Sequence, residues 1–517
     1  MNKYILLPVL ALTLTLASCD MDKNPYNSIP EDEALMTPTD FTNMSVPLYT
    51  SMRSFVGSSY FCTGPDEQSD DFNATVAAGI SDLHRWDFNT SLRSGESLYS
   101  SCLSMMASAN FIIDGYNKCD MSNKNLFTDE AIATVKNVKG EAFFVRAYFL
   151  FNLAQFFCAD YDESIADEKN SGVSYRTDYY PSSNSATYPA RKTLRETYKQ
   201  ITDDLDSALL YVNVAGEQSN YYISVDAVKA MQARVALAMD DYTTAAEKAT
   251  EVIGTNTYTL AGSVDRLTQM WAGNFDTESI LKLSASATSQ LSSQTGLQYL
   301  PYTSGGTPSY IPTQSVIDLY SDDDYRKSVY FLPLTFQTST GVVGNVLAFN
   351  KYPEKAYPYE ATNGYDYARF TIEPKVIRIS EMYLIAAEAY AQLAKTDGSY
   401  LTKAAQYLND FKLKRIANYK TETYSSTDRI MTEIRNERHR EFLGEGMRLL
   451  DLKRWHMGIT RGVPQQEDIC AMPGADYSTG LTKPADDYHF VWPIPQHEMD
   501  TNPQIVQNPG YKFNHLK

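Results

Sequence analysis

This sequence has no excess of positive charge. Its 517 residues contain 45 Lys and Arg against 63 Asp and Glu, which gives a formal net charge of −18. Nucleic-acid binding requires basic patches that neutralise phosphates, and docking on anionic lipid by charge alone requires them too. Neither kind of partner is therefore expected.

Long apolar runs are also lacking beyond the N-terminus. Lys3 precedes an apolar run from Tyr4 to Leu16, whereas no later stretch approaches the ~20 apolar residues of a membrane-spanning helix. This pattern is typical of a secretory signal, which leaves a soluble body. The run ends in Leu-Ala-Ser-Cys at residues 16–19. Small residues before a cysteine resemble a bacterial lipobox, in which Cys19 becomes the lipidated first residue. An ordinary signal peptide with a chance cysteine is the alternative.

Ligand sets for metals are missing as well. The six histidines form neither HExxH nor a Cys/His zinc pattern, and the six cysteines include no CxxC, so no metal site is expected. The cysteines other than Cys19 are Cys62, Cys102, Cys119, Cys158 and Cys470. Because this number is odd, at least one stays free or pairs with another chain, and the pairing is left open.

Catalytic motifs are absent in the same way. There is no nucleophile elbow, P-loop or glycine-rich strand-to-helix turn, so neither an enzymatic activity nor a cofactor is expected. Between Arg435 and Arg454, acids such as Glu437 and Glu441 have basic neighbours at helical spacing. Such pairs usually lock helices together, and this block is interpreted as structural. A secreted glycan hydrolase, which needs two carboxylates in a cleft, is the alternative from another functional class.

Helical periodicity dominates what the sequence does contain. Apolar residues recur at spacings of three and four from Val225 to Ile253, and Asp240-Asp241 forms a polar turn between the two halves. This pattern predicts a pair of antiparallel helices. A second hairpin is predicted from Ser380 to Ile416, where aromatic and small residues have tetratricopeptide-like spacing. We therefore expect a mostly α-helical fold of tetratricopeptide-like hairpins, with an unrelated helical bundle as the alternative.

The helical segments flank a region of different composition. Residues 261–373 are rich in Ser, Thr, Gly, Pro and Tyr, and a structureless loop of that size is improbable in a compact protein. We expect a loop-rich lobe that carries the ligand surface, because binding residues tend to lie on loops held by a rigid scaffold. The expected organisation is a signal peptide at 1–18, a lipidated tether at 19–40, a helical scaffold at 41–260 and 374–517, and the inserted lobe at 261–373.

Several blocks of the sequence resemble the SusD/RagB family of surface lipoproteins. In chain order these blocks are Gly140–Tyr148, Arg378–Ala389, Ile434–Trp455 and Trp492–Tyr511. The resemblance implies a surface-exposed, lipid-anchored protein of the outer membrane that captures extracellular oligosaccharide. It also implies a partner, a SusC-like TonB-dependent outer-membrane transporter to which the cargo is delivered. A peptide ligand, and a role limited to capping the transporter, stay open as alternatives.

Aromatic side chains in loops are the candidates for sugar binding, because their flat faces stack on sugar rings while polar neighbours bond to hydroxyls. The resemblance places a binding loop before the first repeat helix and further ligand aromatics in the lobe. The candidates are Asp70, Asp71, Arg85, Trp86, Asn89, Trp271, Tyr299, Tyr302 and Tyr310. We expect Trp86 and at least one of the three tyrosines to line one exposed carbohydrate surface. Burial of Trp86 is the alternative.

Overall fold

The computed structural model describes residues 33–58, 61, 64–77, 81–213, 220–272, 275–286, 289, 291, 307–353, 372–471 and 481–512. The helices are α2 (Pro38–Val56), α3 (Gly64–Gln68), α4 (Asp82–Arg85), α5 (Arg93–Lys118), α6 (Asp129–Phe157), α7 (Leu194–Tyr211), α8 (Val225–Ala238), α9 (Tyr242–Gly254), α10 (Val264–Trp271), α11 (Gln314–Ile317), α12 (Tyr325–Tyr330), α14 (Ile379–Leu393), α15 (Tyr400–Lys412), α16 (Thr427–Phe442), α17 (Arg448–Arg454) and α18 (Gln496–Thr501). The strands are β1 (Phe72–Ala74), β2 (Ser279–Lys282), β3 (Tyr310–Pro312), β4 (Phe331–Gln337), β5 (Val343–Phe349), β6 (Lys375–Arg378), β7 (Ile459–Arg461) and β8 (Leu481–Lys483). The fold is mostly helical, as predicted. Among the described helices, none has the length and apolar character needed to cross a membrane.

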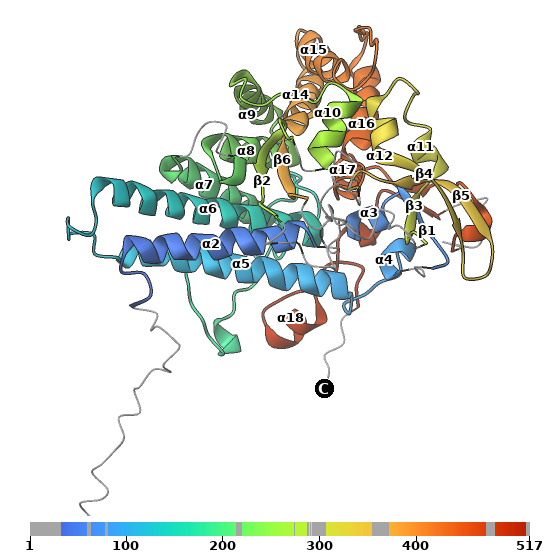
Figure 1. Ribbon diagram of the computed structural model, residues 1–517. Coiled ribbons are helices and arrows are strands. Elements are labelled where there is room, and N and C mark those ends of the chain that lie inside the picture. The colour runs from blue at the N-terminus through green and yellow to red at the C-terminus, as the bar shows by residue number, and fades with distance from the viewer. Residues whose placement is uncertain are drawn as a thin grey trace, which may run out of the picture.

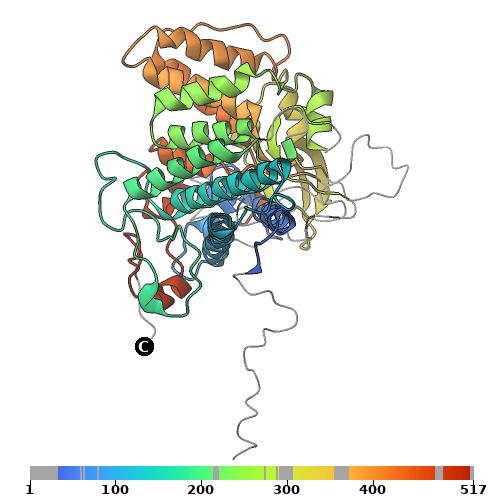
Figure 2. The ribbon, with the colours of Figure 1, turned by 90° about the vertical axis from the view of Figure 1, so that its left-hand side faces the viewer.

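The long helices stack into one array (Figures 1 and 2). Helices α2, α5 and α7 all pack against α6, α8 packs against α7, and α9 pairs with α8. Helix α14 then packs against α9, although residues 255–378 separate the two helices in the sequence. Helices α15 and α16 extend the array beyond α14. The scaffold is therefore continuous in space but interrupted in sequence.

Helix α6 forms the centre of the largest core. From Val138 to Phe157 nearly every side chain is buried, because α2, α5 and α7 surround the helix. Burial on all sides is typical of a helix in a protein interior, and the charged Arg146 is buried there because it pairs with Asp204 at 2.6 Å. Gly140 allows the close approach of α7: a Cβ at this position would lie 2.7 Å from the backbone nitrogen of Val212.

Both predicted hairpins are present. Helices α8 and α9 are joined at Asp240, which has a positive φ of 58°, and Asp241 caps the N-terminus of α9 by accepting a hydrogen bond from the backbone N–H of Thr244. Aspartate tolerates this left-handed conformation better than most residues, which explains the tight turn. The second hairpin consists of α14 and α15, which pack against each other.

The lobe between α9 and α14 contains short antiparallel sheets. Strand β1, from outside the lobe, pairs with β3 so that Phe72 lies opposite Pro312, and β4 pairs with β5 so that Phe331 lies opposite Phe349. A separate hydrophobic core underlies these strands, with Trp271 among its members. Strands β2 and β6 pair near the two ends of the lobe and lie against α8.

The described cysteines differ in how deeply their side chains are buried. Cys102 and Cys158 are buried, Cys119 is half-buried, and these three form no disulfide. Cys470 is also buried, and Cys62 lies outside the described residues.

Candidate functional site

The two predicted acids after α3 point into the protein. The Asp70 carboxylate accepts two hydrogen bonds from the Arg448 guanidinium, both at 2.8 Å. Burial by itself would raise the pKa of Asp70, but Arg448 lowers that pKa to about 2. Asp71 is fully buried and contacts the ring of His439. These acids attach the segment before β1 to α16 and α17, so they are not free to bind a sugar.

Asp70, Asp71 and His439 also have the spacing of a cation site. Their ligand atoms lie within 4.8 Å of one another. Both oxygens of Asp70 are nevertheless engaged by Arg448, whose positive charge stands where a cation would otherwise be bound. The two Asp70 oxygens that a metal ion would need are therefore already occupied by the arginine.

Trp86 is buried, which contradicts the prediction that it lines an exposed surface. Its side chain is 1% exposed, and its indole Nε1 donates to the backbone carbonyl of Gln68 at 2.7 Å. The ring packs edge-on against Phe490 with centroids 4.8 Å apart, among Leu449 and Leu452. The C-terminal segments cover this tryptophan. Its neighbours Arg85 and Asn89 are exposed, so they remain available to a ligand.

The lobe aromatics that are described are also buried. Trp271 is 2% exposed and Tyr310 is 4% exposed, so neither can form part of an exposed shelf. Tyr310 lies on β3, while Trp271 ends α10 and has the ammonium of Lys351 4.6 Å from its ring centroid. Tyr299 and Tyr302 lie outside the described residues, and their role in binding stays a prediction.

A buried charge cluster joins the lobe to the array. The Glu441 carboxylate on α16 accepts hydrogen bonds from Arg415, from Arg378 on β6 and from Arg326 on α12, at distances between 2.8 and 3.1 Å. All four residues are fully buried or nearly so. Burial would raise the pKa of Glu441, but Arg415 and Arg378 hold that pKa well below its usual range. The same arginines also pair with further buried or nearly buried acids, Glu278, Asp324, Glu437 and Glu445. The cluster is therefore a structural junction in which acids compensate the arginines.

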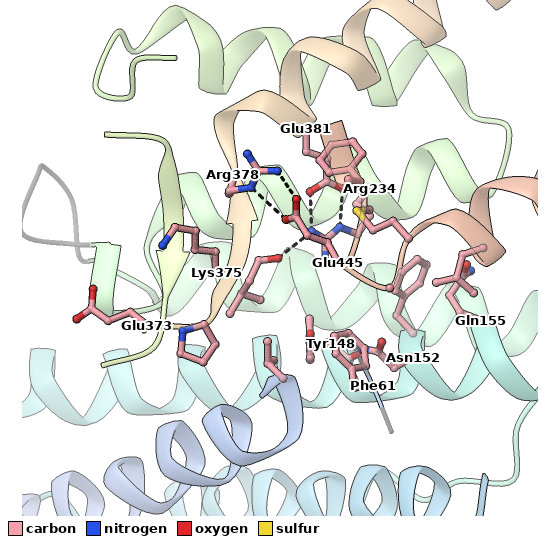
Figure 3. Close-up of a pocket in the computed structure, with 18 of the residues that line it drawn as sticks. Phe61, Tyr148, Asn152, Gln155, Arg234, Glu373, Lys375, Arg378, Glu381 and Glu445 are labelled. Atoms are coloured by element: carbon pink, nitrogen blue, oxygen red, sulfur yellow. Dashed lines mark hydrogen bonds and ion pairs between the residues drawn. The ribbon is translucent and has the colours of Figure 1, made fainter. Parts of the chain in front are cut away.

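A cavity lies beside this junction, between α6, α14 and the lobe (Figure 3). Its polar lining is already paired: Arg234 donates to Glu381 at 2.6 and 2.7 Å, and Arg378 donates to Glu445 at 2.5 and 3.1 Å. The cavity volume is about 90 Å³, whereas pockets for small ligands usually measure roughly 300–1,000 Å³. A sugar ring does not fit in this space.

A larger hollow runs along the outer face of α5, and we call it the α5 groove. Its volume is about 480 Å³. It is lined by Leu103, Met106, Ala107, Asn110, Ser174, Tyr175, Arg176, Asp178, Tyr179, Tyr180, Pro181, Tyr188, Pro189, Glu498 and Asn502. A second hollow of about 380 Å³ shares Tyr179 with it and continues toward Lys118 and Met36. This surface is aromatic, open and of ligand size.

Residues 174–189 form the wall of the groove opposite α5. Hydrogen bonds between this wall and α5 hold it in place. Asn110 Nδ2 donates to the carbonyls of Arg176 and Asp178 at 3.0 and 3.1 Å, and the Tyr179 N–H donates to Asp114 at 2.7 Å. Asn110 is itself held by Arg146, whose Nη1 donates to its Oδ1 at 2.8 Å. The aromatic wall is thus attached to the core of the array.

Sequence reasoning missed this groove. A usable signal was present, because Tyr175, Tyr179, Tyr180 and Tyr188 fall within one connection between two long helices. Tyrosines gathered in a loop on a helical scaffold are candidates for ligand contact.

Comparisons with known proteins place the chain among carbohydrate-binding relatives. One family model, described as the SusD family, matches residues 348–511, and a second, described as starch-binding associating with outer membrane, matches residues 21–237. The chain belongs to the SusD family. No curated protein sequence matches it.

Solved structures of other SusD proteins share the fold. A SusD superfamily protein from Bacteroides thetaiotaomicron is 24% identical, with a TM-score of 0.75, and the alignment covers 92% of this chain and 100% of that one. A SusD-like carbohydrate binding protein from Bacteroides vulgatus is 17% identical over 91% and 98% of the two chains, with a TM-score of 0.71. A laminarin binding SusD-like protein is 20% identical over 92% and 100%, with a TM-score of 0.68.

Proposed function

We propose that this SusD-family protein captures oligosaccharides at the cell surface and delivers them to a partner TonB-dependent outer-membrane transporter. The observation that carries the proposal is the match of both halves of the chain to SusD models, one of them described as starch-binding at the outer membrane. The Leu-Ala-Ser-Cys sequence at residues 16–19 supports lipid anchoring through Cys19.

Three buried or nearly buried acids of the C-terminal block and the segment before β1 give no support to a catalytic role. Glu441, Asp70 and Asp451 each accept hydrogen bonds from arginine inside the protein. A general acid needs a carboxyl group that can exchange protons with the substrate, and these groups cannot do so while they are buried and paired. The alternative of a glycan hydrolase receives no support from them.

Arg85 and Asn89 are the remaining described candidates for the lobe-side glycan contact. Both are exposed; Arg85 is the last residue of α4, and Asn89 lies on the connection between α4 and α5. Their donors would bond sugar hydroxyls, and a hydrogen bond to a charged group contributes about 1.5–3 kcal/mol. Tyr299 and Tyr302 are the aromatic partners predicted from the sequence.

The test is affinity gel electrophoresis of the full chain in gels that contain starch, laminarin, xylan or mannan. We expect retardation by at least one of these polysaccharides, no release of reducing sugar, and at least about five-fold weaker binding by the Arg85→Ala/Asn89→Ala variant. Lys199→Ala, an exposed residue on α7, is the control and should bind like the wild type. Migration unaffected by every polysaccharide would contradict the proposal, and turnover of any of them would support the hydrolase.

Delivery to a transporter is tested separately. Affinity purification of the tagged protein from native membranes should recover a β-barrel protein of the outer membrane. Recovery of the protein alone under mild detergent and after cross-linking would contradict the transporter partnership while leaving the glycan-binding role intact.

A further inference from the structure

The α5 groove combines ligand-sized volume with aromatic walls. Its main hollow, at about 480 Å³, lies within the range of roughly 300–1,000 Å³ that is usual for ligand sites. The Tyr180 side chain is 52% exposed at the rim, while Tyr179 and Tyr188 are half-buried. Tyrosine presents a flat apolar face and a polar hydroxyl, which are the two features that a sugar ring requires.

The groove is longer than a single sugar ring. Leu103 lines the main hollow and Lys118 lines the adjoining one, and Tyr179 belongs to both. These two positions on α5 are separated by roughly 22 Å, at about 1.5 Å of helix rise per residue. Such a surface suits a segment of a chain-like ligand.

The charges along the groove favour a neutral ligand. Arg176 is paired with Asp178 at 2.7 Å and lies over the ring of Tyr180, 4.6 Å from its centroid. The remaining charged residues are Asp114, Glu498 and Lys118. Because acids outnumber bases here, a glycan that carries carboxylates or sulfates would be repelled.

The backbone of the wall is already engaged, which disfavours an extended peptide. The carbonyls of Arg176 and Asp178 accept from Asn110, the N–H of Tyr179 donates to Asp114, and the carbonyl of Pro189 accepts from Ser174 and Asn502. A peptide that binds as an added strand needs free backbone groups along an edge. Aromatic faces and side-chain polar groups are what this wall offers instead.

From this geometry we propose that the α5 groove is a second carbohydrate site, which holds a segment of a neutral oligosaccharide by stacking on Tyr180 and Tyr188. The inference rests on the proposed glycan-binding function and adds a site on the helical scaffold, whose lining includes neither Arg85 nor Asn89. Two sites on one rigid body would bind one polysaccharide chain more firmly than either site alone, provided that the chain spans both.

Two groove variants of the full chain test the proposal in the polysaccharide gels described above. Tyr180→Ala removes the exposed stacking face, and Ala107→Trp places a bulky side chain in the hollow from an exposed position on α5. Each should weaken retardation by a neutral polysaccharide about ten-fold, the scale of one lost aromatic stack. Tyr222→Ala is the matched control, because Tyr222 is also 52% exposed but lies in a different hollow, beside α2. Melting temperatures of all three variants should equal that of the wild type.

The outcomes separate this inference from the proposed function. If the wild type is retarded by a neutral polysaccharide and both groove variants are retarded equally well, the second site is wrong and the glycan-binding function stands. If no polysaccharide retards the wild type, the proposed function fails and the inference fails with it. If a casein digest binds the wild type and is lost from Tyr180→Ala, while no polysaccharide binds, the groove is a peptide site and the carbohydrate assignment is overturned.

Discussion

Glu441 accepts two hydrogen bonds from the Arg415 guanidinium, one on each carboxylate oxygen at 2.9 Å. The same carboxylate accepts from Arg378 on β6 and from Arg326 on α12. One acid on α16 therefore ties together the end of the second hairpin, the strand that closes the lobe and a helix within the lobe. This geometry agrees with the structural role predicted for the acidic and basic block around it.

Glu441→Gln should destabilise the protein strongly. Breaking a buried ion pair by removing one partner costs roughly 3–5 kcal/mol, and here three buried guanidinium groups lose the one carboxylate that they share. Chemical denaturation should show a free energy of unfolding lower by about this amount. Glu433→Gln, on the same helix but part-exposed and 3.8 Å from Lys412, should change stability by less than about 1 kcal/mol. Equal stabilities of the two variants would mean that the cluster does not hold the lobe in place.

Trp86→Phe should lower stability without changing glycan affinity. The substitution removes the hydrogen bond to the Gln68 carbonyl and leaves space beside Phe490, at a combined cost of about 2 kcal/mol. Arg85→Ala, at the exposed neighbouring position, should leave the free energy of unfolding within about 0.5 kcal/mol of the wild type. A Trp86→Phe variant with native stability and weaker retardation in polysaccharide gels would indicate that Trp86 does contribute to glycan binding.

Glu67→Gln should flatten the pH dependence of stability. Burial raises the pKa of Glu67 from 4.5 to about 7, although Ser81, Tyr310 and Arg461 act in the opposite direction. The folded protein then binds a proton more tightly than the unfolded chain, so this contribution to stability is complete below pH 4.5 and is lost as the pH rises from 4.5 to 7. Relative to the wild type, the variant should gain up to about 3 kcal/mol across this window. Urea unfolding at several pH values measures the difference, and parallel curves would refute the assignment.

Cys19→Ala should abolish lipid attachment. The small residues before Cys19 motivate the prediction, and acyl chains bind a membrane through about 0.8 kcal/mol for each buried CH₂. Radiolabelled palmitate should enter the wild type but not the variant, which should leave the membrane fraction or fail to mature. The control is Cys119→Ala, which changes a half-buried thiol on the folded body and should retain the label. Undiminished labelling of Cys19→Ala would mean that Cys19 is not the site of lipid attachment.

The helical scaffold could be predicted because its information is local. The spacing of Val228, Met231 and Val235 gives the buried face of α8, and the polar pair after Met239 marks its turn into α9. These signals lie within one or two helix turns of the structure they determine. The mostly helical fold and both hairpins followed directly from them.

The candidate site could not be predicted equally well, because burial of a loop residue depends on distant segments. Trp86 is covered by Leu449, Leu452 and Phe490, which lie more than 360 positions further along the chain, as the residue numbers show. The same applies to the α5 groove, whose wall exists because Asn110 binds the carbonyls of Arg176 and Asp178. A periodic pattern reports which face of a helix is apolar, but it does not report which loop folds over a given aromatic ring.

The contact between α9 and α14 has a consequence for how the chain reaches its native state. Helices α5 to α9 meet their neighbours in sequence order, and contacts of this local kind form quickly during folding. The docking of α14 on α9 must instead close a loop that contains the whole lobe, and the entropic cost of such closure is compensated only once long-range contacts form. Assembly from the N-terminal side is therefore expected, with the C-terminal helices and the lobe joining in the final, slowest phase. Until then the flank of α9 and the side chain of Trp86 stay uncovered, and apolar surface exposed in this way promotes aggregation during folding.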